Sequence, residues 1–435
     1  MAKRIHEIRD PIHNFIRLDS GERNVLDSRP FQRLRYIHQL ALTYLVYPGA
    51  THRRFEHSLG VMELAGRVYD IVTEPDNIHE SISTIVPPHD SYDHQYWRRV
   101  LRMAALCHDM GHLPFSHAAE KDLLPDGWDH ERLTIDIIQS CEMESIWKDL
   151  KIQPDDVAKL AVGPKKYKDA TFSDWEILLS EIIVGDAFGV DRMDYLLRDS
   201  HHAGVAYGKF DYYRLIDTIR ILPREYEDST EPTLGIEEGG LHSAESMLLA
   251  RYFMYMQLYF HHVRRIYDIH LKDFLKAWLS DGYLPVALDD HLQLTDNEVT
   301  AELQKAARDE KHPGHDPARR IVNREHFRLL YHRNPDDLRK NPDAAEAIFD
   351  AACNKFGRET VRYDSYEQKR SVLDFPILDN DGRIVSSQAK SVTLKNVPIV
   401  AVDYIFISPK YRKNAEDWLK QNREIIITQK EEDEL

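Results

Sequence analysis

Apolar residues recur at intervals of three or four along much of the first 280 residues, and this spacing constrains the fold of the 435-residue chain more than any other feature. In the stretch H-S-L-G-V-M-E-L-A-G-R-V-Y-D-I-V, one helical face would carry Leu59, Met62, Ala65, Tyr69 and Val72. Similar patterns predict helices in R-R-V-L-R-M-A-A-L-C, E-I-L-L-S-E-I-I-V and D-R-M-D-Y-L-L-R-D, and over residues 243–275. The first part of the chain is therefore expected to form a helical core.

The composition changes after about residue 285. Residues 303–345 are charged and compatible with helix, whereas R-E-T-V-R-Y and V-P-I-V-A-V-D-Y-I-F-I are rich in β-branched residues and predict a small sheet. Residues 74–96 contain Pro75, Pro87 and Pro88 and are expected to form a loop. The expected fold class is mainly α, with a smaller α+β carboxy-terminal region.

Charge and cysteine content exclude several classes of protein. The formal net charge of −16 argues against a protein that coats nucleic acid, because phosphate backbones are bound through excess Lys and Arg. Three scattered cysteines, Cys107, Cys141 and Cys353, are too few for a disulfide framework or a thiolate zinc site. We find neither an apolar run of membrane-spanning length nor a signal peptide, so the expected location is the cytoplasm, with no membrane partner.

Residues 105–117, A-L-C-H-D-M-G-H-L-P-F-S-H, place three histidines and an aspartate at the end of a buried helix. His108 and Asp109 point in different directions on a helix, so they can share an ion only if other segments complete the shell. His57 and Asp191 are the candidates, both in helical contexts. Two imidazoles and two carboxylates suit Mn, Mg, Fe, Ni or Zn without selecting among them. The alternative is a set of unconnected polar residues.

At this point the residues resemble the HD-domain phosphohydrolases, and more narrowly their deoxynucleoside triphosphate triphosphohydrolase branch. The similarity covers roughly residues 1–280 and rests on long ordered stretches: D-P-I-H at 10–13, F-Q-R-L-R-Y-I at 31–37, Y-P-G-A-T-H-R-R-F-E-H-S-L-G-V at 47–61, C-H-D-M-G-H-L-P-F-S-H at 107–117, and D-R-M-D-Y-L-L-R-D-S-H-H at 191–202. The resemblance implies an all-helical HD core over residues 51–280, preceded by a segment, 1–50, that contributes to the active site and to oligomer contacts. Residues 281–435 would form a carboxy-terminal region of unassigned role.

The resemblance also implies roles for individual residues. Divalent metal binding falls to His57, His108, Asp109 and Asp191, and the reacting phosphate would meet His112, His130 and Glu131. An imidazole four residues after His108 would lie on the same side and could protonate a leaving oxygen, while Glu131 would orient His130. Positions that match triphosphate contacts are Arg54, His117, Arg192, Tyr195 and Arg251, and those around the deoxyribose are Gln39, Leu40, Asp199 and Tyr259.

Three positions depart from the family pattern. Arg192 and His38 each replace a lysine, and Glu120 replaces an aspartate three residues after His117, so the chemistry there is expected to be retuned. Asp27, Gln32 and Arg35 resemble a guanine-reading activator site between subunits, although His6 and Glu7 do not match its lysine-containing part. The resemblance therefore implies a homo-oligomer, a dimer or tetramer, with an activating nucleotide as a further partner.

The function predicted from the sequence is metal-dependent hydrolysis of a deoxynucleoside triphosphate to a deoxynucleoside and tripolyphosphate. One alternative keeps the site but changes the substrate to another nucleotide or phosphate ester. Another is a nucleotide sensor or nucleic-acid-binding protein with a structural HD centre. Arg54, Arg192 and Arg251 favour a polyphosphate substrate, and the histidines beside the metal ligands favour an enzyme.

Overall fold

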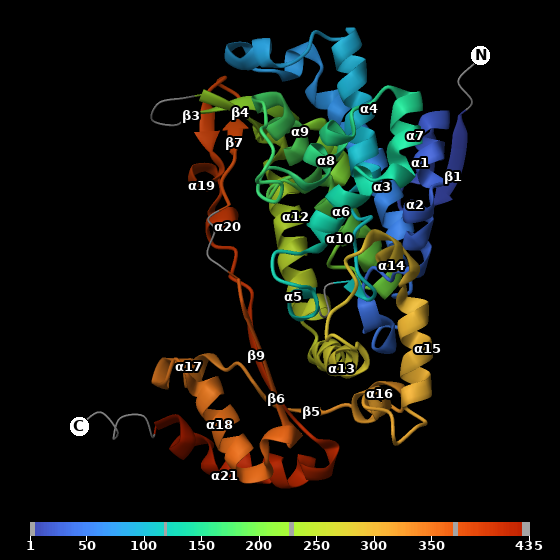
Figure 1. Cartoon of the computed structure of the whole chain (residues 1–435). Coiled ribbons are helices and arrows are strands. Elements are labelled where there is room, and N and C mark those ends of the chain that lie inside the picture. The colour runs from blue at the N-terminus through green and yellow to red at the C-terminus, as the bar shows by residue number, and fades with distance from the viewer. Residues whose placement is uncertain (1–4, 117–119, 226–229, 369–372, 429–435) are drawn as a thin grey trace. The chain divides into compact units, whose positions relative to one another are not determined.

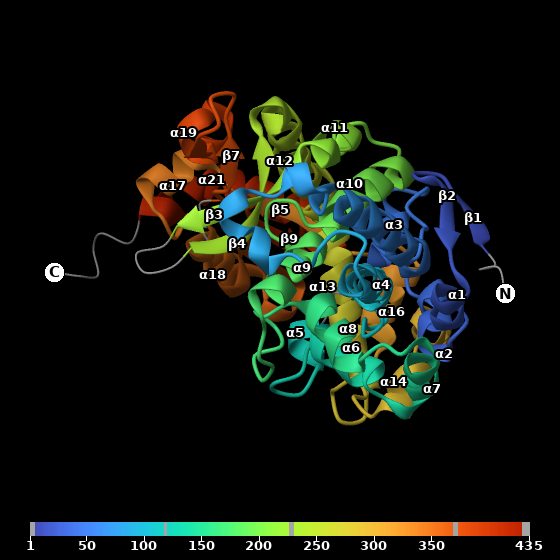
Figure 2. The ribbon, with the colours of Figure 1, turned by 90° about the horizontal axis from the view of Figure 1, so that it is seen from above.

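The computed structural model describes residues 5–116, 120–225, 230–368 and 373–428, which divide into two compact units (Figures 1 and 2). The first unit comprises Met1–Met254, Leu284–Val299 and Ser371–Val397, and the second comprises Tyr255–Tyr283, Thr300–Arg370 and Pro398–Leu435. The sequence-based division at residues 50 and 280 stays a prediction.

Helices dominate the first unit and confirm the expected fold class. They are α1 (Ser20–Leu26), α2 (Arg29–Arg33), α3 (Arg54–Val72), α4 (Tyr92–Cys107), α5 (Glu120–Leu123), α6 (His130–Ile138), α7 (Cys141–Leu150), α8 (Pro154–Val162), α9 (Asp174–Val184), α10 (Val190–Ala203), α11 (Tyr212–Asp217), α12 (Leu241–Met254), α14 (Leu288–Gln293), the start of α15 (Asp296–Ala306), α19 (Ser387–Lys390) and α20 (Val392–Lys395). Short 3₁₀ turns cover Leu34–Tyr36, Ala41–Leu45, Pro75–Asn77, Glu80–Ile85 and Glu238–Gly240.

Local signals determine where the helices of the core begin and end. The Glu56 carboxylate accepts a hydrogen bond from the Arg53 amide at the start of α3, and Ser91 caps the first turn of α4. Helix α10 ends at Gly204, whose φ of 73° favours glycine. Helix α3 packs against both α4 and α10 (Figure 2). The three helices thus bring segments far apart in the sequence to one place.

Two β structures in the first unit differ from the helical expectation for this part of the chain. Strands β1 (His6–Asp10) and β2 (Asn14–Leu18) form an antiparallel hairpin, and H-E-I-R-D has the alternating pattern of a strand. Strands β3 (Ile219–Glu225) and β4 (Thr230–Glu237) pair antiparallel. Strand β4 also pairs in parallel with β7 (Pro376–Leu378), which pairs with β8 (Ile384–Ser386). The segment 74–96, expected as a loop, contains two 3₁₀ turns and the start of α4.

The second unit is built on a three-stranded antiparallel sheet in the order β5 (Arg328–His332), β9 (Ala401–Ile407) and β6 (Val361–Glu367). Strands β6 and β9 confirm the small sheet expected from the β-branched stretches, whereas β5 lies within a region expected to be helical. The helical elements of this unit are a π-helical turn at Tyr255–Tyr259, α13 (His262–Trp278), the rest of α15, α16 (His315–Val322), α17 (Pro335–Lys340), α18 (Ala344–Phe356), a 3₁₀ turn at Arg358–Thr360, a 3₁₀ turn at Pro409–Tyr411 and α21 (Arg412–Thr428).

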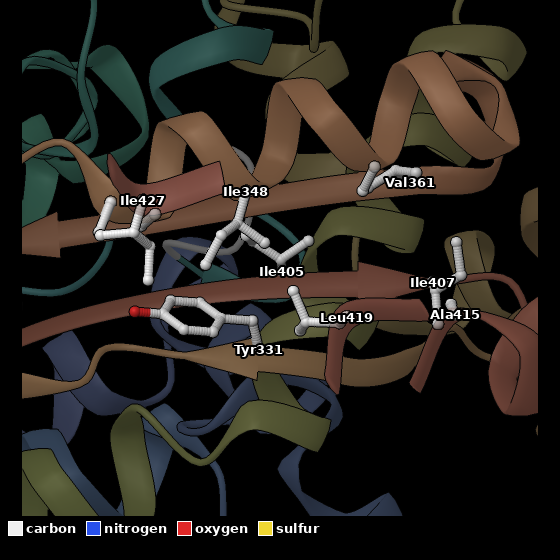
Figure 3. Close-up of a cluster of buried hydrophobic side chains, with 11 residues drawn as sticks. Tyr331, Ile348, Val361, Ile405, Ile407, Ala415, Leu419 and Ile427 are labelled. Carbon is white, nitrogen blue, oxygen red and sulfur yellow. The ribbon is translucent and has the colours of Figure 1, made fainter. Parts of the chain in front are cut away.

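Buried aliphatic side chains join the sheet of the second unit to α18 and α21. Ile348 of α18, Ile405 of β9 and Leu419 of α21 belong to one cluster, with Tyr331 at its edge (Figure 3). Ile348 and Ile405 are completely buried. Removal of this apolar surface from water supplies much of the stability of the unit.

Among the residues that the structure describes, no helix combines the length and the apolarity needed to cross a bilayer.

Truncation of Ile348 tests the importance of this cluster. We expect Ile348→Ala to lower the free energy of unfolding by about 2–5 kcal/mol, because it leaves a cavity in a packed core. Ile425→Ala is the matched control, since Ile425 also lies on a helix of this unit but is 55% exposed. It should change stability by no more than about 0.5 kcal/mol. Equal losses for the two variants in denaturant titrations would contradict the assignment of the core.

Candidate active site

His57, His108 and Asp191 converge in the first unit, although they come from three different helices. His57 lies in the first turns of α3, His108 caps the end of α4, and Asp191 lies in the first turn of α10. The His57 Nε2 atom is 3.0 Å from a carboxylate oxygen of Asp191, and His108 Nε2 is 3.6 Å from the same oxygen. One ligand atom from each residue lies within 4.8 Å of the others, as residues that hold a single cation require.

The hydrogen bonds of both imidazoles suit metal binding. His57 uses Nδ1 to contact Asp194 at 2.8 Å, and His108 uses Nδ1 to contact the carbonyl oxygen of Ala105 at 2.8 Å. Such bonds select the tautomer that leaves the Nε2 lone pair available as a ligand. His108 Nε2 is buried and has no hydrogen-bond partner among the residues that the structure describes. A divalent cation would satisfy this otherwise orphaned atom, so the residues fit such an ion.

Asp109, the fourth expected ligand, lies beside these three residues but is also held by an arginine. Its carboxylate oxygens are 3.4 Å from His108 Nε2 and 3.7 Å from His57 Nε2. Arg54 donates to Asp109 at 2.5 Å through one terminal nitrogen, while its Nε donates to Ser116 Oγ at 2.8 Å. Asp109 therefore connects the cation cluster to a buried guanidinium that can face an anionic substrate.

The surrounding carboxylates favour positive charge at the cluster. Burial lowers the pKa of the His57 imidazole, but hydrogen bonds to Asp191 and Asp194 outweigh it and raise this pKa to about 10. Burial raises the pKa of Asp109, yet Arg54, His108 and His112 together hold it well below its usual range. The carboxylates that would keep a proton on His57 are also those that would attract a divalent cation in its place.

Asp194 supports the cluster from behind. Its carboxylate contacts His57 Nδ1 at 2.8 Å and His13 Nε2 at 2.7 Å, and it accepts two hydrogen bonds from Arg198 at 2.8 and 2.9 Å. Arg198 also donates to Asp10 at 2.8 Å, so the β1–β2 hairpin is tied to α3 and α10. A Cβ on Gly60 would stand 1.9 Å from an Asp194 oxygen, which explains the glycine one helical turn after His57.

His112 and His130 form a second part of the site. His112 Nε2 is 3.1 Å from Asp109, and the two imidazole rings stack with centroids 4.0 Å apart. Gly111 makes this approach possible, because a Cβ there would lie 2.2 Å from the carbonyl oxygen of His130. The turn after Asp109 and the start of α6 therefore pack directly against each other.

Glu120, rather than Glu131, is the carboxylate nearest to His130. Glu120 accepts from the His130 amide at 2.8 Å and lies 2.6 Å from Nδ1, whereas Glu131 is 3.2 Å from Nδ1. Glu131 is paired at 2.7 Å with Lys166, which weakens its influence on the imidazole. Glu120 is therefore a second carboxylate at His130, and the role of Glu131 in orienting this imidazole stays a prediction.

The pKa values of the two stacked histidines are shifted in opposite directions. Burial lowers the pKa of His130, but Glu120 and then Glu131 reverse this effect and raise the pKa above its ordinary value. Burial, Arg54 and His130 hold the pKa of His112 well below its ordinary value despite Asp109. One imidazole is thus set up to carry a proton and its neighbour to be neutral, a division typical of acid and base partners.

The structure places most of the expected substrate residues in the first unit. Gln39 and Asp199 both contact His52: the Gln39 amide donates to its carbonyl oxygen at 3.0 Å, and Asp199 lies 2.7 Å from its Nε2. Leu40 is buried beside Gln39 in sequence. Tyr195 lies one turn after Asp191 in α10.

Two further arginines that were expected to contact the triphosphate, Arg192 and Arg251, lie in α10 and α12 of the first unit. Arg192 donates to the carbonyl oxygens of Gly185 and Asp186, so its guanidinium lies over the segment between α9 and α10. Arg251 lies in the last turn of α12 and is half-buried. Tyr259 belongs to the π-helical turn of the second unit, and His117 lies outside the described residues. The roles of all these residues stay predictions.

The expected activator residues lie on neighbouring segments. The Gln32 side chain donates to Leu26 at 2.7 Å, and Arg35 donates to Gln32 at 2.8 Å while its guanidinium covers the ring of Phe55. Asp27 caps the end of α1 and pairs with Arg23 at 2.6 Å. Asp27 and Arg35 are exposed, so a nucleotide role for this segment stays a prediction.

Sequence reasoning did not single out Asp194, Arg198, Asp10 or His13 as site residues. Their signal is visible in retrospect. Asp194 and Arg198 have the i,i+4 spacing of a helical ion pair, and Asp194 follows Asp191 by three residues on the same helix. A buried aspartate with a matched arginine next to a metal ligand is the pattern expected of a residue that orients that ligand.

Comparisons with known proteins agree with this geometry. An HD domain model matches residues 54–198, and an HD associated region model matches residues 210–380. The chain is 33% identical over 417 residues to the uncharacterized protein YwfO of Bacillus subtilis, a match that covers 89% of this chain and 88% of that protein. A crystal structure of a hypothetical protein from Aquifex aeolicus superimposes with a TM-score of 0.78 and 32% identity, covering 96% of this chain and 100% of that one.

The chain is also similar to a group of larger relatives. It is 30% identical over 331 residues to the human deoxynucleoside triphosphate triphosphohydrolase SAMHD1. This match covers 67% of this chain and 49% of that protein. The chain therefore spans about half the length of this relative.

Replacement of Asp194 tests its support of the cation cluster. We expect Asp194→Asn to lower the free energy of unfolding by about 3–5 kcal/mol, because Arg198 would be left buried without its partner. Folded protein should bind Mn²⁺ about 10–100-fold more weakly, since His57 would lose the acceptor that orients it. Denaturant titration and calorimetry measure the two effects.

Glu63→Gln is the matched control for Asp194→Asn. Glu63 pairs with Arg67 at the same i,i+4 spacing on α3, but Arg67 is partly exposed. Its loss should cost about 0–1 kcal/mol and leave Mn²⁺ affinity unchanged. Unchanged metal affinity in Asp194→Asn would mean that this carboxylate has only a structural role.

Proposed function

The chain belongs to the HD-domain family of metal-dependent phosphohydrolases, and we propose that it hydrolyses deoxynucleoside triphosphates to deoxynucleosides and tripolyphosphate. The single observation that carries this proposal is the arrangement around Asp109: a cluster that fits a divalent cation, a buried arginine that donates to Asp109, and the stacked pair of His112 and His130, of which His112 contacts Asp109. A site of this kind combines the groups that transfer of a phosphoryl group to water requires.

The substrate's polyphosphate would be bound by three arginines, although the net charge of the protein is −16. Arg54 is buried and already fixed by Asp109 and Ser116, so it can contact a phosphate with little loss of side-chain entropy. Arg192 and Arg251 would contact the other phosphates of the triphosphate chain. Manganese or magnesium, held by His57, His108, Asp191 and Asp109, would supply Lewis-acid stabilisation of phosphate oxygens.

The stacked histidines would move the protons of the reaction. Water attacks the α-phosphorus and the bond to the 5′-oxygen breaks, so one proton must leave the water and another must reach the sugar. We propose that His112, whose pKa is lowered, accepts the first proton and that His130, whose pKa is raised, supplies the second, so that His130 takes the acid role expected of His112 from the sequence. Glu120 stabilises the protonated form of His130 before the reaction begins.

Recognition of the sugar would rest on the segment around residue 40. Leu40 and Asp199 would border the deoxyribose, and His52 holds the Asp199 carboxylate at 2.7 Å. The Gln39 side-chain oxygen is buried without a partner among the described residues, and a sugar hydroxyl would satisfy it.

Regulation and assembly complete the proposal. Asp27, Gln32 and Arg35 would read an activating nucleotide at a contact between subunits of a dimer or tetramer. The hydrogen bonds from Arg35 to Gln32 and from Gln32 to Leu26 give this segment a defined conformation before any nucleotide binds.

The proposal is tested by incubating the purified protein with each of the four dNTPs, singly and in pairs, with Mn²⁺ or Mg²⁺. Anion-exchange analysis should show tripolyphosphate and deoxynucleoside in equal amounts and only with metal. Asp109→Ala should lose at least about 10²-fold in turnover, because both the cation cluster and Arg54 lose a partner. Dependence on a second nucleotide would identify the activator.

Other products would replace the proposal. Release of pyrophosphate or monophosphate would indicate cleavage at another phosphorus, and metal-dependent hydrolysis of a different phosphate ester alone would change the substrate class. No release under any pairing would argue against hydrolysis of dNTPs.

The pH dependence of turnover tests the role of Glu120. Because this carboxylate raises the pKa of His130, Glu120→Gln should lower that pKa. His130 must be protonated to act as an acid, so the alkaline limb of the kcat profile should move to lower pH. Glu131→Gln is the matched control and should produce a smaller shift, because Glu131 is also neutralised by Lys166. An alkaline limb that does not move in Glu120→Gln would exclude His130 as the acid.

A further inference from the structure

The turn that follows the metal-binding segment adopts an uncommon backbone conformation. Phe115 and Ser116 have φ angles of 55° and 56°, and two successive residues with side chains are thus left-handed. For residues with a Cβ atom, this conformation is disfavoured relative to the right-handed form. Both residues are buried, at 0% and 5% exposure, so surrounding contacts must hold the turn in place.

Asp296 provides the main polar contact to this turn. One of its carboxylate oxygens accepts a hydrogen bond from the Phe115 amide at 2.7 Å. The other oxygen accepts from the His38 amide at 2.8 Å and lies 2.6 Å from His38 Nδ1. The His38 ring in turn stacks in parallel on the Phe115 ring, with centroids 6.1 Å apart. A carboxylate that is 1% exposed thus joins three segments of the first unit.

The local sequence places Asp296 where it can make these contacts. In T-D-N-E, Thr295 accepts from the Asn297 amide at 3.2 Å, and Glu298 accepts from the Thr295 amide at 2.8 Å. This capping arrangement begins α15 at Asp296. Arg33 anchors the same segment, because it donates to the carbonyl oxygens of both Leu294 and His112.

The turn matters because Ser116 holds the arginine of the site. Ser116 Oγ accepts from Arg54 Nε at 2.8 Å and donates to the His38 carbonyl oxygen at 3.1 Å. His38 is therefore bonded to Asp296 through its amide and to Ser116 through its carbonyl oxygen. With its Nε held by Ser116, Arg54 donates to Asp109 through a terminal nitrogen.

We propose that Asp296 is a positioning residue for phosphate binding: it holds the left-handed turn at Phe115 and Ser116, and thereby fixes the Arg54 guanidinium beside Asp109. The inference rests on the proposed function only in taking a polyphosphate as the ligand of Arg54. An asparagine could not replace the aspartate, because it would present its NH₂ group to one of the two sets of N–H donors. One buried donor would then lose its acceptor, and the turn would relax.

The first experiment measures the binding of inorganic tripolyphosphate in the presence of Mn²⁺ by calorimetry, without any turnover. Asp296→Asn should raise the Kd about tenfold or more, and Asp290→Asn should leave it unchanged, since Asp290 is an exposed carboxylate on the neighbouring helix α14. Mn²⁺ affinity in the absence of tripolyphosphate should stay the same in both variants. A general loss of structure would weaken metal binding as well, which distinguishes positioning from simple destabilisation.

A double-mutant cycle with Ser116→Ala identifies the route of the effect. If Asp296 acts through Ser116, the Kd of the double variant for tripolyphosphate should be no higher than the higher of the two single-variant Kd values. If the two residues acted independently, the fold-increases in Kd would multiply. For a dNTP that the wild type hydrolyses, kcat/KM should follow the same pattern.

The outcomes separate this inference from the proposed function. Wild-type binding of tripolyphosphate without dNTP hydrolysis would contradict the proposed function alone. Unchanged tripolyphosphate affinity in Asp296→Asn, or multiplied effects in the cycle, would overturn the positioning role. If Asp296→Asn does not fold, Ser116→Ala decides: the inference requires weaker tripolyphosphate binding with Mn²⁺ affinity retained, and unchanged tripolyphosphate binding overturns it.

Discussion

The buried ion pair between Asp194 and Arg198 is the interaction on which the rest of the site depends. The pair lies within one helix, yet its remaining bonds reach His57 on α3 and both Asp10 and His13 on the β1–β2 hairpin. A buried carboxylate is stable only if its charge and its lone pairs are matched, so each of these partners must be in place at once. The position of the His57 imidazole, an expected metal ligand, is thereby coupled to the packing of three elements.

Charge is distributed so that one small region can accept both a cation and an anion. Asp191 and Asp109 lie close to His57 and His108, and Arg54 donates to the same Asp109 oxygen that lies 3.7 Å from His57 Nε2. In a water-poor interior, these charges interact more strongly than on the surface. The net charge of −16 therefore says little about the ligand, because three or four buried groups determine the local potential.

Much of the helical fold and the cation cluster could be predicted from the sequence. The apolar spacing around Leu59 and the composition of the stretch that forms β9 are local signals, and both correspond to observed elements. The convergence of His57, His108 and Asp191 could be predicted because the chain resembles a family in which the matching positions bind one metal ion. The β1–β2 hairpin was missed because five alternating residues are a weak signal beside charged neighbours.

What the sequence could not reveal are the contacts that depend on three-dimensional packing. Glu131 follows His130 directly in the sequence, whereas Glu120 is ten residues away. Only the observed distances show that Glu131 forms an ion pair with Lys166 and that Glu120 contacts the His130 imidazole at 2.6 Å. Asp296 is separated from Phe115 by 181 residues, and no local pattern connects the two.

Because the site depends on contacts between distant segments, it exists only in the folded protein. The residues that could hold a cation lie at the ends of α3, α4 and α10, and no single segment could hold a cation alone. In the unfolded chain these residues are far apart, and their carboxylates and imidazoles are hydrated. A cation that binds only the assembled cluster therefore stabilises the native first unit by mass action. The physical source of that coupling is the buried Nε2 atom of His108, unpartnered among the described residues, together with the Asp109 and Asp191 carboxylates that lie 3.4 and 3.6 Å from it.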